Sequence, residues 1–203
     1  MPMDMISIWV ASATGDLDEV RRFFENENVD VDLQDRDGMT LLMQASKNDR
    51  RDVILYLVEN MKANVDLQDN QGNTALHHAS YRGQADAIRC LVERGNANVN
   101  LRNRYGKTAL LCVFDCPNRN IVRYLLEIGK ANVNLSDNLG KTALMHASIK
   151  GKLELVRYLV ESGKANVNIK DCKGRTALMH ASHKGHTEVV HYLQKKNYGR
   201  NQE

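Results

Sequence analysis

A Thr-Ala-Leu triplet returns every 34 residues through most of this chain, and this period limits the possible folds more than any other feature. The triplet begins at Thr74, Thr108, Thr142 and Thr176, and Thr40 begins a related Thr-Leu-Leu one period earlier. A typical unit continues with Ala-Ser, a glycine, an apolar segment, a second glycine, Ala-Asn-Val-Asn and Asp-x-x-Gly. Short units that repeat without insertion predict a linear array in which each unit packs against its neighbours.

Each unit predicts two short helices followed by an extended turn. The first helix begins at the Thr, and a glycine ends each helix by taking the left-handed conformation at little steric cost. Helices of two to three turns are too short to be stable alone in water, so packing between units must stabilise them. The Asp before each turn is expected to bond its own turn backbone, and the asparagines of Asn-Val-Asn are expected to hold the turn geometry.

The last full unit shows the pattern most clearly. Residues 171–182 are Asp-Cys-Lys-Gly-Arg-Thr-Ala-Leu-Met-His-Ala-Ser, and residues 185–190 are Gly-His-Thr-Glu-Val-Val. This resembles the ankyrin-repeat consensus Asp-x-x-Gly-x-Thr-Pro-Leu-His-x-Ala-Ala-x-x-Gly-His-x-x-Val-Val, with Ala or Leu in place of the proline. Tetratricopeptide arrays share the period but lack the Asn-Val-Asn segment. The resemblance implies an all-α solenoid of stacked helix-turn-helix units with short β-type turns.

The period divides a single domain, residues 4–196, into six repeats. We place them at about 4–35, 36–69, 70–103, 104–137, 138–171 and 172–196. The first repeat lacks the preceding turn and has Ile6 at the Thr position, and the last has polar residues late in its second helix. Both are therefore expected to cap the array, and residues 197–203 are expected to form a frayed tail.

Two repeats depart from the pattern. In repeat 4, Pro117 takes the place of the first glycine and should end the first helix early at Cys116, because proline disfavours helix at the residue before it. Phe114 stands where the neighbouring repeats have a small Ser, so its ring must pack into the adjacent repeat or protrude. In repeat 2, Asp49 and Met61 replace the two glycines. The preceding residues, Asn48 and Asn60, are the predicted left-handed positions there.

The inventory of chemical groups gives no support for catalysis, a cofactor or a metal. Motifs for phosphate binding, nucleophilic catalysis and metal ligation are absent from the sequence, so we predict that the chain is not an enzyme. The histidines at equivalent repeat positions should lie about one helix-packing distance apart, ~8–10 Å. A row with that spacing cannot converge on one zinc ion, which requires ligands at about 2.0–2.3 Å.

We expect an intracellular protein, cytoplasmic or alternatively nuclear, that does not associate with membranes and is a monomer. No apolar stretch approaches the ~20 residues that a membrane-spanning helix requires, and the N-terminus does not have the order of a secretory signal. The cysteines Cys90, Cys112, Cys116 and Cys172 are irregularly spaced and are expected to be free thiols. Cys90 replaces a recurring Tyr and is expected to be a small core residue.

In ankyrin proteins, partners usually lie along the concave face formed by the turn tips and first helices, here called the turn face. The resemblance places its variable contact positions four, three and one residues before each Thr, and four, seven and eight after it. Without the fourth-after position, these hold ten Lys or Arg and two Asp in repeats 2–6, so the turn face carries +8 in a chain of net +3. The predicted partner-binding residues are Arg36, Lys47, His78, Tyr81, Arg82, Arg104, Tyr105, Lys107, Lys141, His146, Lys150, Lys173, Arg175, His180 and Lys184.

This charge predicts an anionic partner, with the compensating acidic residues on the back of the array. The first hypothesis is a protein-interaction module, an adaptor, scaffold or inhibitor, that holds an acidic or mixed protein segment. The alternative is recognition of a phosphate-bearing ligand such as RNA or a short oligonucleotide, for which Tyr81 and Tyr105 would have to stack on bases.

Overall fold

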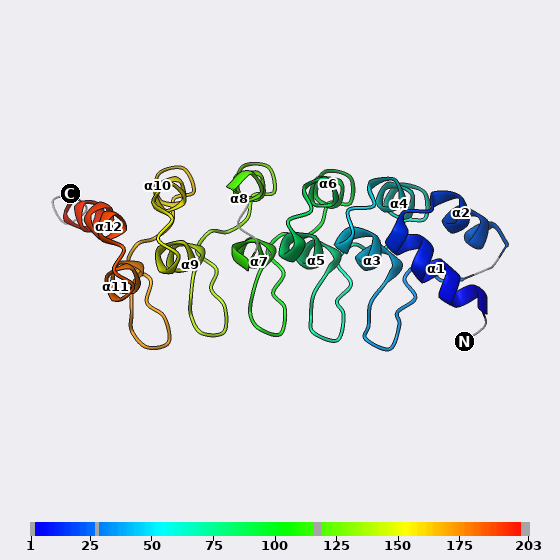
Figure 1. Ribbon diagram of the computed structural model, residues 1–203, viewed down its shortest axis with the longest axis horizontal. Helices are drawn as coiled ribbons and strands as arrows, with labels where there is room; N and C mark the ends of the chain where they lie inside the picture. The colour runs from blue at the N-terminus through cyan, green and yellow to red at the C-terminus, as the bar shows by residue number, and fades with distance from the viewer. Residues whose placement is uncertain (1–2, 27–28, 116–118, 200–203) are drawn as a thin grey trace.

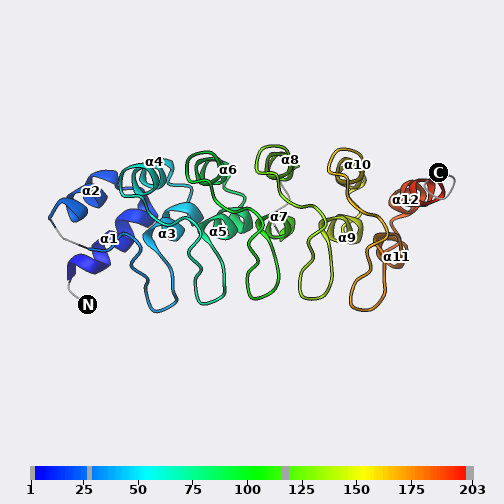
Figure 2. The ribbon, with the colours of Figure 1, turned by 180° about the vertical axis from the view of Figure 1, so that it is seen from behind.

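Two layers of helices and a row of turns run along the whole array in the computed structural model (Figure 1). The structure describes residues 3–26, 29–115 and 119–199. The first helices of the repeats form the middle layer, the second helices lie on one side of it, and the long turns project from the other side, as the view from behind also shows (Figure 2). The turn tips and the second helices therefore lie on opposite sides of the molecule.

The described residues form six helix pairs, which confirms the predicted all-helical solenoid. The first helices are α1 (Met3–Thr14), α3 (Leu41–Lys47), α5 (Ala75–Arg82), α7 (Ala109–Cys112), α9 (Ala143–Ile149) and α11 (Ala177–His183). The second helices are α2 (Leu17–Asn26), α4 (Arg51–Leu55), α6 (Ala85–Arg89), α8 (Arg119–Glu127), α10 (Leu153–Glu161) and α12 (Thr187–Gly199). The π-helical turns η1 (Tyr56–Asn60) and η2 (Cys90–Arg94) extend α4 and α6, and the 3-10 turn η3 (Val113–Asp115) extends α7. In these ranges the only β-type pairing is an isolated bridge between Ser136 and Thr142.

The recurring threonine begins the first helix of repeats 2–6, as predicted. In α5, Thr74 has an extended backbone, and its Oγ1 accepts the backbone N–H of His77 at 3.4 Å. The same bond joins Thr142 to Met145 in α9. A side-chain oxygen at this position satisfies a backbone donor that the first turn of a helix leaves without a partner.

The glycines that follow the first helices take the predicted left-handed conformation, but the prediction for repeat 2 is wrong. Gly83 has φ 71°. In repeat 2 Asp49 itself is left-handed, with φ 58°, whereas Asn48 has φ −110°. The reason lies in the next repeat, because Asp49 Oδ1 accepts the backbone N–H of Ala87 in the first turn of α6 at 2.8 Å.

The glycines that follow the second helices serve close packing, so the left-handed role predicted for them is wrong. Gly95 has φ −89°, and the left-handed residue is the next one, Asn96. Lys62 takes this place in repeat 2, not the predicted Asn60. A Cβ on Gly95 would lie 2.8 Å from Cγ1 of Val65 in the preceding repeat. Glycine is used here because two repeats meet at the end of the second helix.

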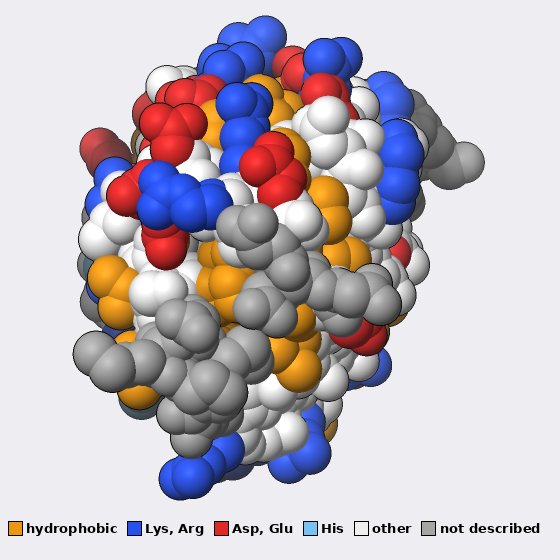
Figure 3. Space-filling model, turned by 90° about the vertical axis from the view of Figure 1, so that its right-hand side faces the viewer, with side chains coloured by type: hydrophobic (Ala, Val, Ile, Leu, Met, Phe, Trp, Pro, Cys, Tyr) orange, Lys and Arg blue, Asp and Glu red, His pale blue; other side chains and the backbone are white. Residues whose placement is uncertain are grey.

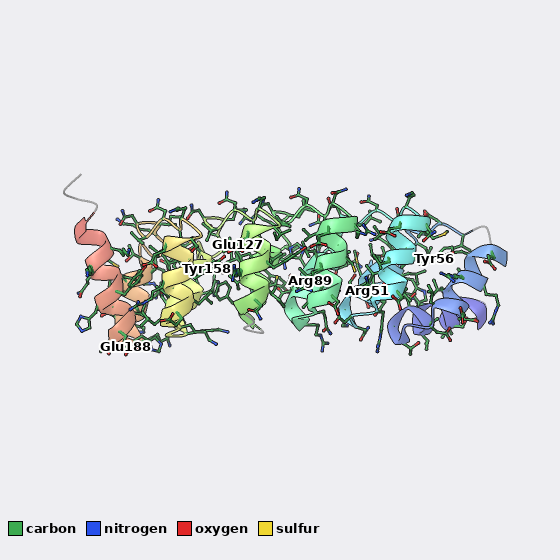
Figure 4. The ribbon with its side chains drawn as sticks, turned by 90° about the horizontal axis from the view of Figure 1, so that it is seen from above. Arg51, Tyr56, Arg89, Glu127, Tyr158 and Glu188 are labelled. Carbon is green, nitrogen blue, oxygen red and sulfur yellow. The ribbon has the colours of Figure 1, made fainter. Side chains whose placement is uncertain are left out.

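A row of tyrosines joins consecutive second helices on the side shown in Figure 4. The hydroxyl of Tyr158 in α10 donates to Glu127 at the end of α8 at 3.0 Å. The same bond, at 2.9 and 3.0 Å, joins Tyr124 to Glu93 and Tyr192 to Glu161. Cys90 occupies the tyrosine position in repeat 3 and is buried, as predicted. Burial raises the pKa of its thiol.

Side-chain amides of the Asn-Val-Asn segments form a second row of hydrogen bonds along the array. Asn98 Oδ1 accepts the N–H of Asn100 at 3.1 Å, and Asn100 Oδ1 accepts the N–H of Asn132 in the next repeat at 2.8 Å. Asn134 repeats the second bond to Asn166. The expected structural role in turn geometry is confirmed, and the same bonds also set the register between repeats.

Repeat 4 has the short first helix that its sequence predicts. Helix α7 ends at Cys112 and continues only as η3, whereas α9 runs to Ile149. Cys116 and Pro117 lie outside the described residues. Phe114 packs into the next repeat, since its ring is 2% exposed and stacks on His146 with the ring centroids 5.9 Å apart.

The two ends differ from the interior. Helix α1 begins at Met3, before the Thr-equivalent Ile6, and Figure 3 shows hydrophobic side chains on this end of the stack. Ile6 and Val10 are exposed, whereas Ala11 is buried as in the other repeats. At the other end α12 continues to Gly199, and residues 200–203 lie outside the described ranges.

Candidate functional site

An aspartate before the turn bonds the turn backbone in four of the five turns, as predicted, and Asn103 does so in the remaining one. Asp137 Oδ1 accepts the backbone N–H groups of Leu139 and Lys141, both at 2.9 Å. Gly140 has φ 76°, a conformation that favours glycine, and a Cβ there would lie 2.8 Å from the backbone nitrogen of Cys172 in the next tip. Successive tips are joined by backbone bonds, such as Asn138 N–H to the carbonyl of Tyr105 at 2.9 Å. The backbone of each tip is therefore bonded both within its own turn and to the neighbouring tips.

The second oxygen of the same aspartates binds a histidine nine residues later. His78 Nε2 lies 2.8 Å from Asp69 Oδ2, and His146 Nε2 lies 3.0 Å from Asp137 Oδ2. His180 forms the equivalent pair with Asp171 at 2.9 Å. The three histidines of the predicted partner-binding face are thus half-buried or buried, and each already has an internal partner.

Burial and bonding set the charge of these pairs. Burial lowers the pKa of His78 and His146, although the paired carboxylate opposes this effect. Burial alone would raise the pKa of Asp69, but backbone hydrogen bonds from Asn73 and Gln71, together with His78, lower it overall. A neutral imidazole that donates Nε2–H to a carboxylate fits both directions.

A hollow of about 460 Å³ lies among the turn tips of repeats 4 and 5 and the end of α5. Tyr105 and Leu139, each at the tip of a turn, are 59% and 61% exposed and line it together with Tyr81. The ammonium of Lys107, which also lines it, lies 5.4 Å from the centre of the Tyr81 ring. Asp137 and Asn138 complete the lining. The hollow thus combines apolar walls with one cationic group.

The other predicted residues of the turn face differ in how accessible they are. Arg36, Arg82, Arg104, Lys150, Lys173 and Lys184 are exposed, and Lys47, Lys141 and Arg175 are half-buried. Lys150 and Arg175 have internal partners that the sequence did not reveal. Lys150 Nζ donates to the carbonyl of Phe114, and the Arg175 guanidinium contacts Asp171 Oδ2 at 2.9–3.0 Å.

The positive charge of the turn face increases along the array. Five of its ten Lys and Arg residues belong to repeats 5 and 6, which have no acidic residue at the contact positions. The whole chain follows the same direction, because residues 1–69 hold 15 acidic and 7 basic residues whereas residues 70–203 hold 10 and 21. Of the 25 acidic residues, 15 therefore lie in the first two repeats, so the charge also separates along the long axis of the array.

Leu139 was not among the fifteen predicted site residues, although it occupies one of the variable contact positions. Its signal was available, because a leucine at a turn tip, between Asn138 and Gly140, has no local structural role. Its neighbourhood could not be read from the sequence, since Tyr81 and Tyr105 belong to other repeats.

A second hollow, of about 300 Å³, lies on the opposite side of the molecule between α4 and α6. Cys90 lines it where the other repeats have tyrosine, and Arg51 and Arg89, labelled in Figure 4, belong to its rim. Asp86 and Glu93 stand among these arginines, so this hollow has no dominant charge.

Within the described ranges, no three His, Cys, Asp or Glu side chains could hold a metal ion together. None of the described helices is long and apolar enough to cross a membrane.

Comparison with known proteins identifies the family. The sequence matches the family model described as ankyrin repeats (3 copies) at residues 7–103, 61–137 and 116–202. The chain belongs to the ankyrin-repeat family. The resemblance inferred from the repeated motif is thereby confirmed. Comparison with curated proteins gives no match.

Two solved structures show close similarity over nearly the whole ankyrin array. One is the complex of the Bd0816 predatory endopeptidase from Bdellovibrio bacteriovorus with immunity protein Bd3460, in which the matching chain is 29% identical with a TM-score of 0.82. The alignment covers 93% of this chain and 97% of that chain. The other is an ankyrin repeat domain (ABAYE2397) from Acinetobacter baumannii AYE, 30% identical with a TM-score of 0.81, covering 93% of this chain and 96% of that chain.

Proposed function

We propose that this ankyrin-repeat chain is a non-enzymatic protein-interaction module, an adaptor, scaffold or inhibitor, that binds an acidic or mixed segment of a partner protein along its turn face. The observation that carries the proposal is the combination on one rigid surface of exposed apolar tips and basic side chains. Such a surface can bury apolar area at its centre and attract carboxylates around it.

The two sides of the molecule support the choice of this surface. On the second helices, basic side chains are paired with acidic ones, as in Arg94–Glu59 at 2.6 Å and Arg123–Glu127 at 3.0 Å. On the turn face, Arg36, Lys141 and Lys173 occupy three repeat positions at which Asp37 is the only acidic residue in repeats 2–6. A solvated face that only maintains solubility would be expected to mix the two signs.

A solved relative supports a protein as the partner. The chain that matches this one at 29% identity belongs to a complex of an endopeptidase with an immunity protein. Family membership also favours binding, because ankyrin domains are typically protein-binding modules. That complex is a specific precedent for binding to another protein.

A phosphate-bearing ligand is the second candidate, favoured by Tyr105, whose exposed ring stands next to Arg104. Single-stranded nucleic acid binding uses successive aromatic platforms beside a basic track. Tyr81 is a poor second platform, because its ring is half-buried and the Lys107 ammonium lies over it.

Affinity capture from an extract of the native cells tests the proposal. The parent chain is compared with a variant in which Arg82, Lys107, Lys141 and Lys173 are each changed to Glu. Lys150 is kept because its ammonium bonds to the carbonyl of Phe114. Each exposed charge contributes only ~0.2–1 kcal/mol, so four reversals are needed for a clear loss of the partner.

The matched control carries the same change in charge on the other side of the molecule, with Glu at the exposed positions Arg51, Arg89, Lys152 and Lys195. We expect the control to retain the partner and the turn-face variant to lose it. Equal capture by both variants would show that the turn face is not the binding surface. Capture that nuclease abolishes, with an affinity that falls steeply and log-linearly with salt, would replace the protein by a nucleic acid.

A further inference from the structure

We infer that the partner segment inserts one aromatic or long aliphatic side chain into the hollow between Tyr105 and Leu139, and that its carboxylates extend from this anchor toward repeats 5 and 6. The inference rests on the proposed function and specifies the chemistry and the direction of the bound segment.

The lining of the hollow selects the anchor. Tyr105 and Leu139 stand on adjacent turns with most of their side chains exposed, and Tyr81 contributes a ring from the end of α5. A volume of about 460 Å³ lies within the range of ~300–1,000 Å³ that is usual for binding pockets. An apolar side chain that enters this space covers both exposed tips at once. Buried aromatic or aliphatic anchors of this kind contribute most of the binding energy in protein interfaces.

The side chains of Asp137 and Asn138 in the lining already form hydrogen bonds within the protein, which disfavours a polar anchor. Asp137 accepts hydrogen bonds from two backbone N–H groups and from His146. Asn138 Nδ2 donates to the carbonyl of Arg104 at 2.7 Å. A polar side chain inserted here would lose water without gaining equivalent hydrogen bonds.

The charge of the neighbouring repeats sets the direction. Repeat 5 adds Lys141 and Lys150 to the turn face and repeat 6 adds Lys173, Arg175 and Lys184, whereas repeat 2 sets Asp37 beside Arg36. Lys173 and Lys184 are exposed. Carboxylates on the side of repeats 5 and 6 therefore meet a stronger positive potential than carboxylates on the side of repeats 2 and 3.

The spacing of the carboxylates follows from the geometry of the array. Packed helices lie ~8–10 Å apart. An extended peptide advances about 3.3 Å per residue, so it passes one repeat in about three residues. The expected segment thus has its anchor followed, or preceded, by acidic residues about three and six positions away.

Defined peptides test this inference without knowledge of the native partner. The probes are fluorescent 12-residue peptides of Gly and Ser with one Phe and two Glu, placed three and six residues after the Phe in one peptide and before it in the other. Control peptides replace the Phe by Ser or both Glu by Gln. Fluorescence anisotropy measures their affinity for the parent chain and for single variants.

Two pairs of variants separate the anchor from the charge direction. Leu139→Ser alters the hollow, and Ile128→Ser removes a similarly exposed apolar side chain, 55% exposed, just after α8. Lys173→Glu and Arg36→Glu make the same charge change at exposed positions of turns in repeats 6 and 2.

We expect Phe→Ser in the peptide to weaken binding by about tenfold, because it removes most of the apolar area that the hollow covers. Leu139→Ser should lower the affinity for the Phe peptide several-fold, whereas Ile128→Ser should leave this affinity unchanged. Lys173→Glu should lower the affinity more than Arg36→Glu does.

Equal affinities of the Phe and Ser peptides, including the absence of binding by both, would overturn the anchor. An equal or larger effect of Arg36→Glu would overturn the direction. If Leu139→Ser captures the native partner as well as the parent does while the fourfold Glu variant loses it, the inference fails and the proposed function stands.

Discussion

Repeats 4 and 5 are adjacent and have the same architecture, but they stabilise their turns and first helices with different chemistry. At the turn that leads into repeat 5, Asp137 holds the turn with one oxygen and His146 with the other. At the turn that leads into repeat 4, Asn103 takes the place of the Asp, and Cys112 takes the place of the His. Asn103 Oδ1 still accepts two backbone N–H groups, but its Nδ2 donates to Asn73 Oδ1 in the preceding turn at 2.8 Å.

The same contrast continues into the packing. Repeat 5 has Ser148 where repeat 4 has Phe114. Phe114 stacks on His146, so the apolar group of one repeat covers the polar pair of the next. The comparison teaches that this position requires the side-chain oxygen that caps the turn. The second polar atom of the same side chain can bond to the following first helix, as Asp137 does with His146, or to the preceding turn, as Asn103 does with Asn73. The residue in the first helix differs accordingly, because it is His146 in one case and Cys112 in the other.

The largest effect is expected from Phe114→Ala, which removes the apolar contact that joins the two repeats. Truncation of a buried Phe costs ~3–5 kcal/mol of the free energy of unfolding, and the cavity would lie between repeats. Chemical denaturation should show this loss, together with a broader or two-step transition because coupling between neighbours is weakened. A loss below about 1 kcal/mol would show that the contact is not important for stability.

A smaller loss is expected from Asn103→Asp, which gives the turn before repeat 4 the carboxylate found in the turn before repeat 5, without the paired histidine. The new oxygen would face Asn73 Oδ1 in a buried place, so a hydrogen bond becomes a repulsive contact. A buried polar group without a partner costs ~1–3 kcal/mol. Asp137→Asn is the matched reverse change, which keeps the turn bonds, and should cost less. Equal stabilities of Asn103→Asp and the parent would mean that Asn73 rearranges freely.

The parts of this fold that could be predicted from sequence are those set by local geometry. The caps at Thr74 and Thr142 and the turn bonds of Asp137 join residues two to four positions apart, and such patterns are recognisable in any repeat. The short first helix of repeat 4 was predictable for the same reason, because Pro117 acts on the residue before it.

The parts that could not be predicted depend on contacts between repeats. Asp49 is left-handed where Asn48 was predicted, and Asp49 bonds to Ala87, 38 residues later. Gly95 is needed because Val65 of another repeat lies against it. The hollow of the candidate site has the same origin, since its lining comes from three repeats. Residue type at a single turn tip does not show whether its neighbours will form a cavity.

Acidification should separate repeat 5 from repeat 4 by a still smaller effect. The pKa of His146 is lowered in the folded chain, first by burial, so below its ordinary value of 6.5 the unfolded state binds the proton more readily. Stability is therefore complete above pH 6.5 and is lost as the pH falls toward the lowered pKa. Cys112 takes the place of this histidine in repeat 4, so repeat 4 has no imidazole at this position.

Hydrogen exchange, corrected for the intrinsic effect of pH, measures this difference. Between pH 7 and pH 5.5 the amides of residues 143–148 should lose protection relative to those of 109–114. His146→Gln should remove the difference in repeat 5 and leave the response of repeat 3, where burial also lowers the pKa of His78. An unchanged pH response in the His146→Gln variant would mean that another group controls it.

The smallest effect is expected from Ser148→Ala, at the position where repeat 4 has Phe114. The hydroxyl of Ser148 is buried and has no hydrogen-bond partner, and the same is true of the hydroxyls of Ser46 and Ser80. Alanine fits the same space, removes the cost of the unpaired hydroxyl and favours helix, so we expect a gain of ~0.5–1.5 kcal/mol in the free energy of unfolding.

Ser182 occupies the equivalent position in repeat 6 but is exposed, so Ser182→Ala should change stability by less, within ~0.5 kcal/mol. Chemical denaturation of the two variants and their double variant distinguishes burial from helix propensity, because propensity alone would give both alanines the same gain. A loss of stability on Ser148→Ala would show instead that this hydroxyl has a partner in the folded protein, and that repeats 4 and 5 differ less in their use of polar groups than the contrast of Phe114 with Ser148 suggests.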